Sequence, residues 1–312
     1  MNSIGFVGLG NMGLPMARNL IRHTLAKEVL LFDSVPDRVE SFVRSFDRSE
    51  VRGTMQIRNV GSVAELTRHC DAIVTMLPTT CAVLDVCSNH IFPYSTPKSL
   101  LVIDCSTVSP MASRQLAQQA QNKYQIGFVD APVSGGVAGA TAGTLTFMVG
   151  ANDVPLFEAA QSLLTLMGKK IIHTGGAGTG STVKLCNNLA LAIETIAISE
   201  AMNLGVRSGV DAKVLADAMS NSTAACWSST VNNPSPGVIA TAPSSNNYTG
   251  GFLSSLMVKD LKLALRTAQE VNVEAPVGKM ALDLYEEMIN HNDSCSKKDF
   301  SVIYEFISKG LR

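Results

Sequence analysis

Short apolar runs alternate with amphipathic stretches through the first half of the chain. The runs are rich in Val, Ile and Leu, and segments with helical periodicity separate them. Runs that are apolar throughout are typical of strands in a mostly parallel sheet that is covered on both faces. The expected strands are residues 4–8, 29–32, 72–77, 100–103, 126–129, 145–149 and 170–174, and expected helices include residues 13–23, 63–69 and 111–123. The pattern therefore predicts an α/β fold with a doubly wound sheet.

The pattern changes after the glycine cluster at residues 175–180, and the sequence becomes helical almost to its end. The first helix of this half, residues 181–205, is apolar nearly all round, so we expect it to be buried between two layers. Residues 232–251 are rich in Asn, Ser, Pro and Gly and predict a long loop. Further helices are expected at residues 212–220, 256–271 and 276–289. We therefore expect two domains, residues 1–176 and residues 177–312, the second all-α and joined to the first by the long helix.

Composition narrows the class of protein. The chain has 312 residues, of which 46% are apolar and 16% charged, and its net charge is −1. This length suffices for two domains with their own cores, and the charge balance leaves no basic surface for nucleic acid. No apolar run reaches the roughly 20 uninterrupted residues of a membrane-spanning helix, and we expect no signal or transit peptide because the strand pattern begins at residue 4. We therefore expect a soluble, intracellular protein that binds a small molecule, and neither nucleic acid nor a membrane.

Cysteine and histidine are arranged in a way that argues against metal chemistry. The seven cysteines form no C-x-x-C pair, and the five histidines are widely separated along the chain. Isolated cysteines are typical of reduced thiols, and a helical metal site needs histidines one turn apart. We expect no metal, and a general base other than histidine.

A glycine-rich motif lies between the first expected strand and the first expected helix. Its residues are Gly8, Leu9, Gly10, Asn11, Met12 and Gly13. Asp33 ends the second expected strand, 20 residues after Gly13. A G-x-G-x-x-G motif in this setting predicts a dinucleotide site, in which the acidic residue binds the adenosine ribose; a glycine turn of purely structural use is the alternative. The charge of Asp33 would repel a 2′-phosphate, so the sequence favours NAD over NADP.

Three more loops follow expected strands, where ligands bind in open α/β sheets. Leu77 and Pro78 lie in one, and Thr107 lies in the next, and ordinary turn chemistry is the alternative to contact with a cofactor. Ser134, Gly135 and Gly136 form the third. A serine hydroxyl beside two glycines can present backbone N–H groups to an anion, so this loop predicts a carboxylate pocket unless it is structural.

Lys184 and Asn188 lie four residues apart on the apolar helix and therefore share one face. An ammonium group is costly to bury without a partner. The functional interpretation is a desolvated lysine whose pKa falls, so that it exchanges a proton with a substrate hydroxyl, and Asn188 holds the same oxygen or the lysine. The alternative is that Lys184 reaches solvent from the first turn. The pair Lys259 and Asp260 alone predicts a solvated helix face.

These motifs, in this order, resemble those of the β-hydroxyacid dehydrogenase family over nearly the whole chain. The resemblance rests on residues 5–20, 104–107, 130–136, 178–188, 258–260 and 298–301. It implies a Rossmann-type, doubly wound domain that binds NAD, followed by an all-α domain for substrate binding and oligomerisation. The implied activity is oxidation of a short hydroxyacid, with 3-hydroxyisobutyrate from valine breakdown as the expected substrate.

The resemblance also implies roles for single residues. Lys184 is then the catalytic general acid/base and Asn188 assists it, while Ser134, Gly135 and Gly136 hold the substrate carboxylate. Leu77, Pro78 and Thr107 line the NAD site. Lys259 reaches the cofactor from the second domain, which replaces the solvated-face interpretation for that residue.

Two positions depart from the family pattern. Ala82 stands where the family often has an asparagine near the nicotinamide, and the stretch from Phe42 to Arg58 is longer and more charged than usual, which predicts a surface insertion. Alternatives to the expected activity are a sibling β-hydroxyacid dehydrogenase or a reductase of tartronate semialdehyde or succinic semialdehyde, and a non-catalytic, dehydrogenase-like interaction module. The resemblance further implies a homodimer or homotetramer, in the mitochondrial matrix if the source is eukaryotic and in the cytoplasm if it is bacterial.

Overall fold

The computed structural model describes residues 1–47, 51, 53–95 and 100–310. The chain forms two compact units, unit 1 (Met1–Lys184) and unit 2 (Leu185–Arg312). The division between the units falls inside helix α8 (Thr179–Arg207), after the glycine cluster where the sequence pattern changes.

Unit 1 contains a nine-stranded sheet with the order β3-β2-β1-β4-β5-β6-β8-β7, and β9 pairs with β8. The strands are β1 (Ser3–Val7), β2 (Glu28–Phe32), β3 (Gln56–Asn59), β4 (Ala72–Thr75), β5 (Leu101–Asp104), β6 (Gly127–Asp130), β7 (Val133–Ser134), β8 (Leu145–Gly150) and β9 (Gly168–Gly175). Neighbours from β3 to β6 are parallel, whereas β8 runs antiparallel to β6 and β7 and parallel to β9. The predicted, mostly parallel Rossmann-type sheet is confirmed.

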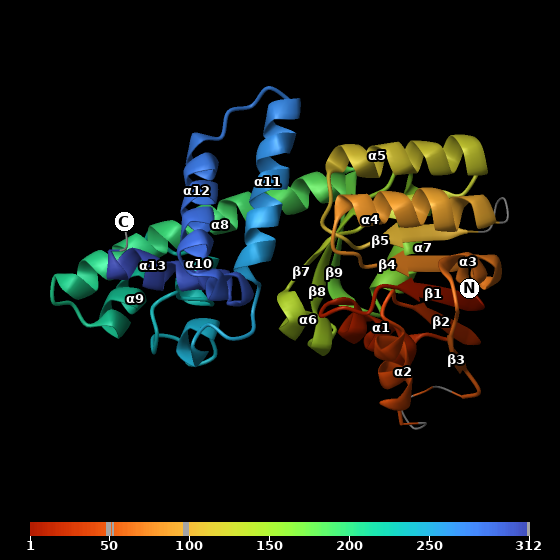
Figure 1. The fold of residues 1–312 in the computed structure, drawn as a ribbon, viewed down its shortest axis with the longest axis horizontal. Helices are drawn as coiled ribbons and strands as arrows, with labels where there is room; N and C mark the ends of the chain where they lie inside the picture. The colour runs from red at the N-terminus through yellow and green to blue at the C-terminus, as the bar shows by residue number, and fades with distance from the viewer. Residues whose placement is uncertain (48–50, 52, 96–99, 311–312) are drawn as a thin grey trace. The chain divides into compact units, whose positions relative to one another are not determined.

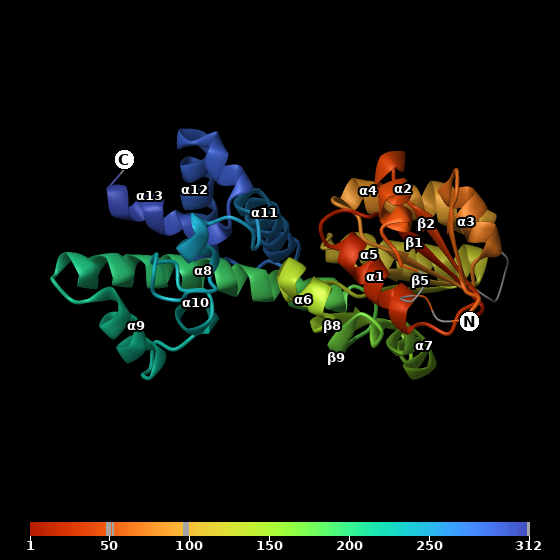
Figure 2. The ribbon, with the colours of Figure 1, turned by 90° about the horizontal axis from the view of Figure 1, so that it is seen from below.

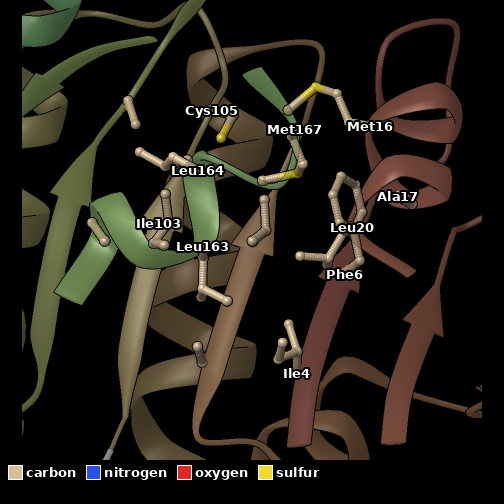
Figure 3. Packing of buried hydrophobic residues seen from close by; sticks show 14 of the residues in the cluster. Ile4, Phe6, Met16, Ala17, Leu20, Ile103, Cys105, Leu163, Leu164 and Met167 are labelled. Atoms are coloured by element: carbon tan, nitrogen blue, oxygen red, sulfur yellow. The ribbon is translucent and has the colours of Figure 1, made fainter. Parts of the chain in front are cut away.

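Helices cover both faces of this sheet (Figure 1). They are α1 (Gly13–His23), α2 (Pro36–Arg44), α3 (Val63–His69), α4 (Thr80–Asp85), α5 (Pro110–Gln119), α6 (Gly136–Ala142) and α7 (Val154–Leu164). One core joins α1, α2 and α7 to side chains such as Phe6 and Ile103, and Figure 3 shows Leu20 of α1 and Leu163 of α7 in it. The second core joins α3, α4 and α5 to the opposite sheet face, where Leu30 and Val102 lie. Alternate strand residues thus enter different cores, which explains why the strands are apolar throughout.

The stretch from Phe42 to Arg58 is not simply a surface insertion, so that expectation is wrong in part. Phe42 is 2% exposed and packs in the core from α2, and Arg58 belongs to β3. The apolar pattern does not predict β3, because this edge strand is mostly exposed and carries no apolar run. Residues 48–50 and 52 of this stretch lie outside the described residues.

Unit 2 is helical, as expected. Its helices are the remainder of α8, then α9 (Ala212–Ser220), α10 (Trp227–Thr230), α11 (Ser254–Glu270), α12 (Pro276–His291) and α13 (Ile303–Lys309). The main core of this unit joins α8 to α11, α12 and α13, and a smaller one joins α8 to α9. Figure 2 shows α9 and α12 on opposite sides of α8. The loop at residues 232–251 holds buried side chains, including Asn233 and Tyr248, so it packs as part of the core.

Helix α8 is less buried than its apolar sequence predicts. Only 33% of its most apolar 18-residue window is buried, and Leu204 remains 70% exposed. The main core of unit 2 takes side chains of α8 between Leu189 and Ile196, and the smaller core takes Ile198 and Met202. By length and mean hydropathy alone α8 could cross a membrane. However, Thr195 and Ser199 are buried on it, and the Thr195 hydroxyl lies 2.9 Å from that of Ser228, the arrangement of a core helix in a folded domain.

Candidate active site

The glycine loop after β1 has the geometry that a dinucleotide requires. A Cβ on Gly8, whose φ is +96°, would lie 2.3 Å from the Met76 carbonyl oxygen, and a Cβ on Gly13 would lie 1.9 Å from the carbonyl oxygen of Gly8. A Cβ on Gly10 would meet nothing within 4 Å. The outer glycines are therefore needed for close packing of strand, loop and helix, while the middle glycine leaves open backbone that a pyrophosphate can approach. This division of roles fits a bound dinucleotide.

Asp33 is held next to this loop. Its carboxylate accepts the backbone N–H of Leu9 at 2.7 Å and that of Val35 at 2.9 Å, and its side chain is only 5% exposed. Arg38 forms a longer ion pair with it, at 3.4 Å. A cavity of about 420 Å³, lined in part by Gly10, Asn11 and Arg38, opens beside the loop. Met12 precedes the first residue of α1.

A buried hydrogen-bond network ties together the loops that follow β4 and β5. The Leu77 backbone N–H donates to Ser106 Oγ at 2.8 Å, and that hydroxyl donates to Asp104 Oδ1 at 2.6 Å. Thr75 donates to the same carboxylate oxygen at 2.8 Å. Complete burial raises the pKa of Asp104 to about 6, against the opposing effect of the Ser106 and Thr75 hydroxyls. Thr107 follows this network and is half-buried.

The loop after β4 continues from Leu77 with Pro78 and Thr79. Pro78 is exposed, and Thr79 caps the start of α4. Ala82, at the departure from the family pattern, donates its backbone N–H to Thr79 Oγ1 at 3.2 Å. Its methyl group offers no side-chain hydrogen bond.

The segment of Ser134, Gly135 and Gly136 leads from β7 into α6. Gly135 and Gly136 both have positive φ, at +131° and +60°. A Cβ on Gly136 would meet nothing within 4 Å, whereas one on Gly135 would lie 3.1 Å from a Leu145 side-chain carbon. Open backbone with successive positive φ values can form a concave surface for an anion, which fits the predicted carboxylate pocket.

Asp130, at the end of β6, holds the beginning of α8. Its two carboxylate oxygens accept the backbone N–H groups of Gly178 at 2.6 Å and Ser181 at 2.7 Å. Burial raises the pKa of Asp130, and these two N–H donors oppose that shift. Lys184 follows in the second turn of the helix and is 8% exposed. The alternative in which Lys184 reaches out to solvent is therefore wrong.

In unit 2, Asn188 lies one helical turn after Lys184 on α8. Its side-chain amide donates to Asp260 Oδ2 at 2.6 Å, and its amide oxygen accepts from Asn187 Nδ2 at 3.1 Å. Lys259 Nζ lies 3.2 Å from Asp260 Oδ1, and Asp260 is 2% exposed. The solvated-face interpretation from local sequence is thus wrong for Asp260, which α11 turns into the core of the unit, whereas the Lys259 side chain is 28% exposed.

The fold gathers most of the predicted residues of unit 1 at one edge of the sheet. Parallel strands β1, β2, β4, β5 and β6 all end at this edge, and the glycine loop, Asp33, Leu77 and Thr107 follow four of those ends. No role was predicted for the residues that organise this edge, namely Thr75, Asp104, Ser106 and Asp130, although residues 104–107 and 130–136 are among those that carry the family resemblance. Polar residues at the ends of apolar strands were the available signal.

Comparisons with known proteins agree with this arrangement. Residues 3–175 match the family described as the NAD binding domain of 6-phosphogluconate dehydrogenase. Residues 178–307 match the family described as NAD-binding of NADP-dependent 3-hydroxyisobutyrate dehydrogenase. Together these matches span both units.

Relatives with full-length similarity carry related names. The chain is 45% identical to "Probable 3-hydroxyisobutyrate dehydrogenase, mitochondrial" of Dictyostelium discoideum, over 99% of this chain and 92% of the relative. It is 40% identical to an NAD-dependent L-serine dehydrogenase of Pseudomonas aeruginosa, over 97% of each chain. The solved structure of Mycobacterium tuberculosis 3-hydroxyisobutyrate dehydrogenase with L-serine has a TM-score of 0.88 and 35% identity, covering 98% of this chain and 99% of that one.

Proposed function

Because the chain belongs to the 3-hydroxyisobutyrate dehydrogenase family of NAD-binding oxidoreductases, we propose that it oxidises 3-hydroxyisobutyrate to methylmalonate semialdehyde. The observation that carries this proposal is a buried lysine, Lys184, followed one turn later by the buried amide of Asn188. A lysine and an amide on one side of a helix suit a substrate hydroxyl that must lose its proton. A non-catalytic module would have no use for this pair.

Proton transfer is the task of Lys184 in this proposal. Bound NAD supplies the hydride acceptor. The carbon that bears the hydroxyl loses its hydrogen with the electron pair, the hydroxyl proton passes to neutral Lys184 Nζ, and the C–O single bond becomes the aldehyde C=O. The lysine also stabilises the negative charge that develops on this oxygen, which lowers the barrier because the charge is largest in the transition state.

The substrate carboxylate is held by Ser134, Gly135 and Gly136. The hydroxyl of Ser134 and the open backbone at Gly136 supply the polar groups. Fixing the carboxylate fixes the position of the hydroxyl group on the far side of the molecule. Orientation of this kind contributes up to roughly 7–11 kcal/mol in favourable intramolecular cases.

Asn188 holds the substrate oxygen, and Asp260 fixes the direction of its amide. Because Asn188 Nδ2 donates to Asp260 and Oδ1 accepts from Asn187, the amide has one defined orientation and one N–H left for the substrate. Lys259 contacts the cofactor while its ammonium pairs with Asp260.

The cofactor site comprises the glycine loop from Gly8 to Gly13, Asp33, and the residues Leu77, Pro78 and Thr107. Asp33 retains free lone pairs after its two backbone hydrogen bonds, and these accept the ribose hydroxyls. The same charge disfavours a 2′-phosphate, so NAD is the preferred cofactor.

L-Serine is the second candidate substrate. It is also a 3-hydroxyacid, and it is named for a relative 40% identical and for a solved structure with a TM-score of 0.88. Serine differs from 3-hydroxyisobutyrate by an ammonium group in place of a methyl group, so the groups that face this substituent decide between them.

A substrate panel tests the proposal. The purified protein is mixed with NAD or NADP and with 3-hydroxyisobutyrate or L-serine, and reduced cofactor is followed by absorbance; tartronate semialdehyde and succinic semialdehyde are tested in the reverse direction. The proposal requires the largest kcat/KM for 3-hydroxyisobutyrate with NAD. A larger kcat/KM for L-serine would make L-serine the substrate in place of 3-hydroxyisobutyrate. No turnover with any of these compounds would support the non-catalytic alternative.

We propose further that the enzyme is a homodimer or homotetramer that works in valine breakdown. The relatives named as mitochondrial favour the mitochondrial matrix if the source is eukaryotic; in a bacterium the compartment is the cytoplasm. Light scattering coupled to gel filtration measures the oligomeric state, and a monomer would contradict this part of the proposal.

A further inference from the structure

A buried amide joins the helix that follows the glycine loop to the helix that follows the proposed carboxylate pocket. Asn19 on α1 is 5% exposed. Its side-chain Nδ2 donates to the Ala140 carbonyl oxygen of α6 at 2.6 Å and lies 3.4 Å from that of Thr141. The amide has two N–H groups, and Nδ2 also donates to the Pro15 carbonyl oxygen of α1 at 3.2 Å. One side chain therefore fixes the end of α6 to α1.

Helix α6 buries little apolar surface of its own. Among its seven residues, all of which the structure describes, Ala140 is the one that is buried. A helix this short, with Gly139 inside it, has low intrinsic stability, and the last carbonyl groups of a helix lack partners within it. Gly143 ends α6 with a φ of +65°, and a Cβ there would lie 3.6 Å from the Asn19 amide. The hydrogen bond from Asn19 therefore contributes much of what keeps α6 in position.

Helix α6 borders both proposed sites of unit 1. It begins at Gly136, the last residue of the proposed carboxylate pocket. Its side chains Val137 and Thr141 line the cavity of about 420 Å³ beside the glycine loop, together with Gly10 and Asn11. Helices α1 and α6 lie side by side in both ribbon views (Figures 1 and 2). A shift of α6 would therefore move the carboxylate pocket relative to the glycine loop.

We propose that Asn19 is a positioning residue for the substrate, because by fixing α6 to α1 it sets the place of the carboxylate pocket relative to the bound cofactor. This inference rests on the proposed role of Ser134, Gly135 and Gly136. Asn19 acts through α6 and not by contact with the substrate, since carbonyl oxygens of the two helices take up its N–H groups. Without this donor the buried Ala140 carbonyl loses its partner, α6 is free to shift, and the carboxylate is held less well.

Two substitutions separate the hydrogen bond from the space that the amide fills. Asn19→Leu keeps most of the side-chain volume but cannot donate, and Asn19→Ala removes both the donor and the volume. Isobutyrate has the carboxylate but no hydroxyl group to oxidise, so its Ki as a competitive inhibitor in the presence of NAD reports on the carboxylate pocket. In both variants we expect this Ki and the KM for 3-hydroxyisobutyrate to rise about fivefold or more, while calorimetry gives a Kd for NAD within about twofold of the wild-type value.

Thr67→Val is the matched control. Thr67 is 2% exposed on α3, and its hydroxyl donates to the Val63 carbonyl oxygen at 2.8 Å, so this variant also loses a buried hydrogen bond of unit 1 but should keep the wild-type Ki and KM. Thermal unfolding shows that each variant is folded, and Asn19→Ala, which adds no bulk, decides the test if Asn19→Leu does not fold.

The outcomes separate this inference from the proposed function. A Ki near the wild-type value in a folded Asn19 variant, or equal losses of isobutyrate and NAD binding, overturns the inference and leaves the proposed function intact. Wild-type protein that neither oxidises 3-hydroxyisobutyrate nor binds isobutyrate overturns the proposed function, and the inference with it.

Discussion

Asn188 and Asp260 form a buried hydrogen bond of 2.6 Å between helices α8 and α11 of unit 2. They are 72 residues apart in the sequence. The bond orients the amide that we assign to the substrate, and Asp260 also pairs with Lys259. One carboxylate thus connects a proposed substrate contact with a proposed cofactor contact.

Two substitutions of Asp260 should distinguish the proposed substrate contact of Asn188 from the proposed cofactor contact of Lys259. Asp260→Asn keeps an acceptor for Asn188 but loses the charge opposite Lys259, so we expect a raised KM for NAD with much of kcat retained. Asp260→Ala loses both and should lower kcat as well. Steady-state kinetics of the two variants measure the difference.

A double-mutant cycle with Asn188→Ala provides the stricter test. The effects of Asp260→Ala and Asn188→Ala on kcat/KM should be non-additive by about 1–3 kcal/mol, because the residues act as one unit. Asp283→Ala, at an exposed ion pair with Lys279 on α12, is the control and should change little. Additive effects would mean that Asp260 does not orient Asn188.

The glycine loop offers a contrast between two alanine substitutions. Gly10→Ala adds a methyl group to open space where the pyrophosphate approaches, so the protein should fold normally and bind NAD more weakly. Gly13→Ala would place a methyl group 1.9 Å from the Gly8 carbonyl oxygen, and it should destabilise the protein itself. Thermal unfolding and NAD calorimetry on both variants distinguish the effects; equal loss of stability would contradict the assigned roles.

Asp130 should contribute to stability and to activity together. Asp130→Ala leaves the buried N–H groups of Gly178 and Ser181 without their acceptor, at a cost of about 1–3 kcal/mol for each group. We also expect kcat to fall, since the start of the helix that carries Lys184 is no longer held. Asp153→Ala removes an exposed cap from α7 and should cost only about 1 kcal/mol with kcat unchanged. An unchanged kcat in Asp130→Ala would show that Asp130 does not help to position Lys184.

The stability of the protein should depend on pH through Asp104. Its pKa is about 6 in the folded protein against the ordinary 3.8. Between these values the folded state holds a proton that the unfolded state has released, so this contribution is complete below about pH 4 and is lost as the pH rises through 6. The loss amounts to about 3 kcal/mol at most.

Asp104→Asn isolates that contribution. The free energy of unfolding from urea titrations at pH 4, 5, 6 and 7 should fall less steeply in the variant than in the wild type. Parallel curves over this range would show that Asp104 has an ordinary pKa in the folded protein.

Most helices and strands could be predicted from the sequence, because the spacing of apolar residues indicates each of them. Helices α1, α3 and α9 have the predicted bounds, and the apolar strands of the sheet interior lie within two residues or so of their expected positions. Strand β3 could not be found, because an exposed edge strand needs no apolar pattern. The charged sequence around it was interpreted as an insertion for the same reason.

The site was predictable only where local sequence carries the chemistry. Glycines with a following acid, and a lysine in an apolar helix, can be recognised from the sequence alone. Their hydrogen-bond partners cannot. Asp260 reaches Asn188 through tertiary packing of α8 and α11, and Asp104 meets Thr75 because β4 and β5 pair in a register that sets these two residues side by side. Neither relationship leaves a local signal.

The most direct test of the account is the turnover of Lys184→Ala with 3-hydroxyisobutyrate and NAD. Loss of the proton acceptor should lower kcat by about 10²–10⁴-fold, while calorimetry shows NAD binding close to that of the wild type. Lys169→Ala, at an exposed lysine of β9, should retain full activity. A Lys184→Ala variant with kcat near the wild-type value would contradict the central claim that this lysine carries the chemistry.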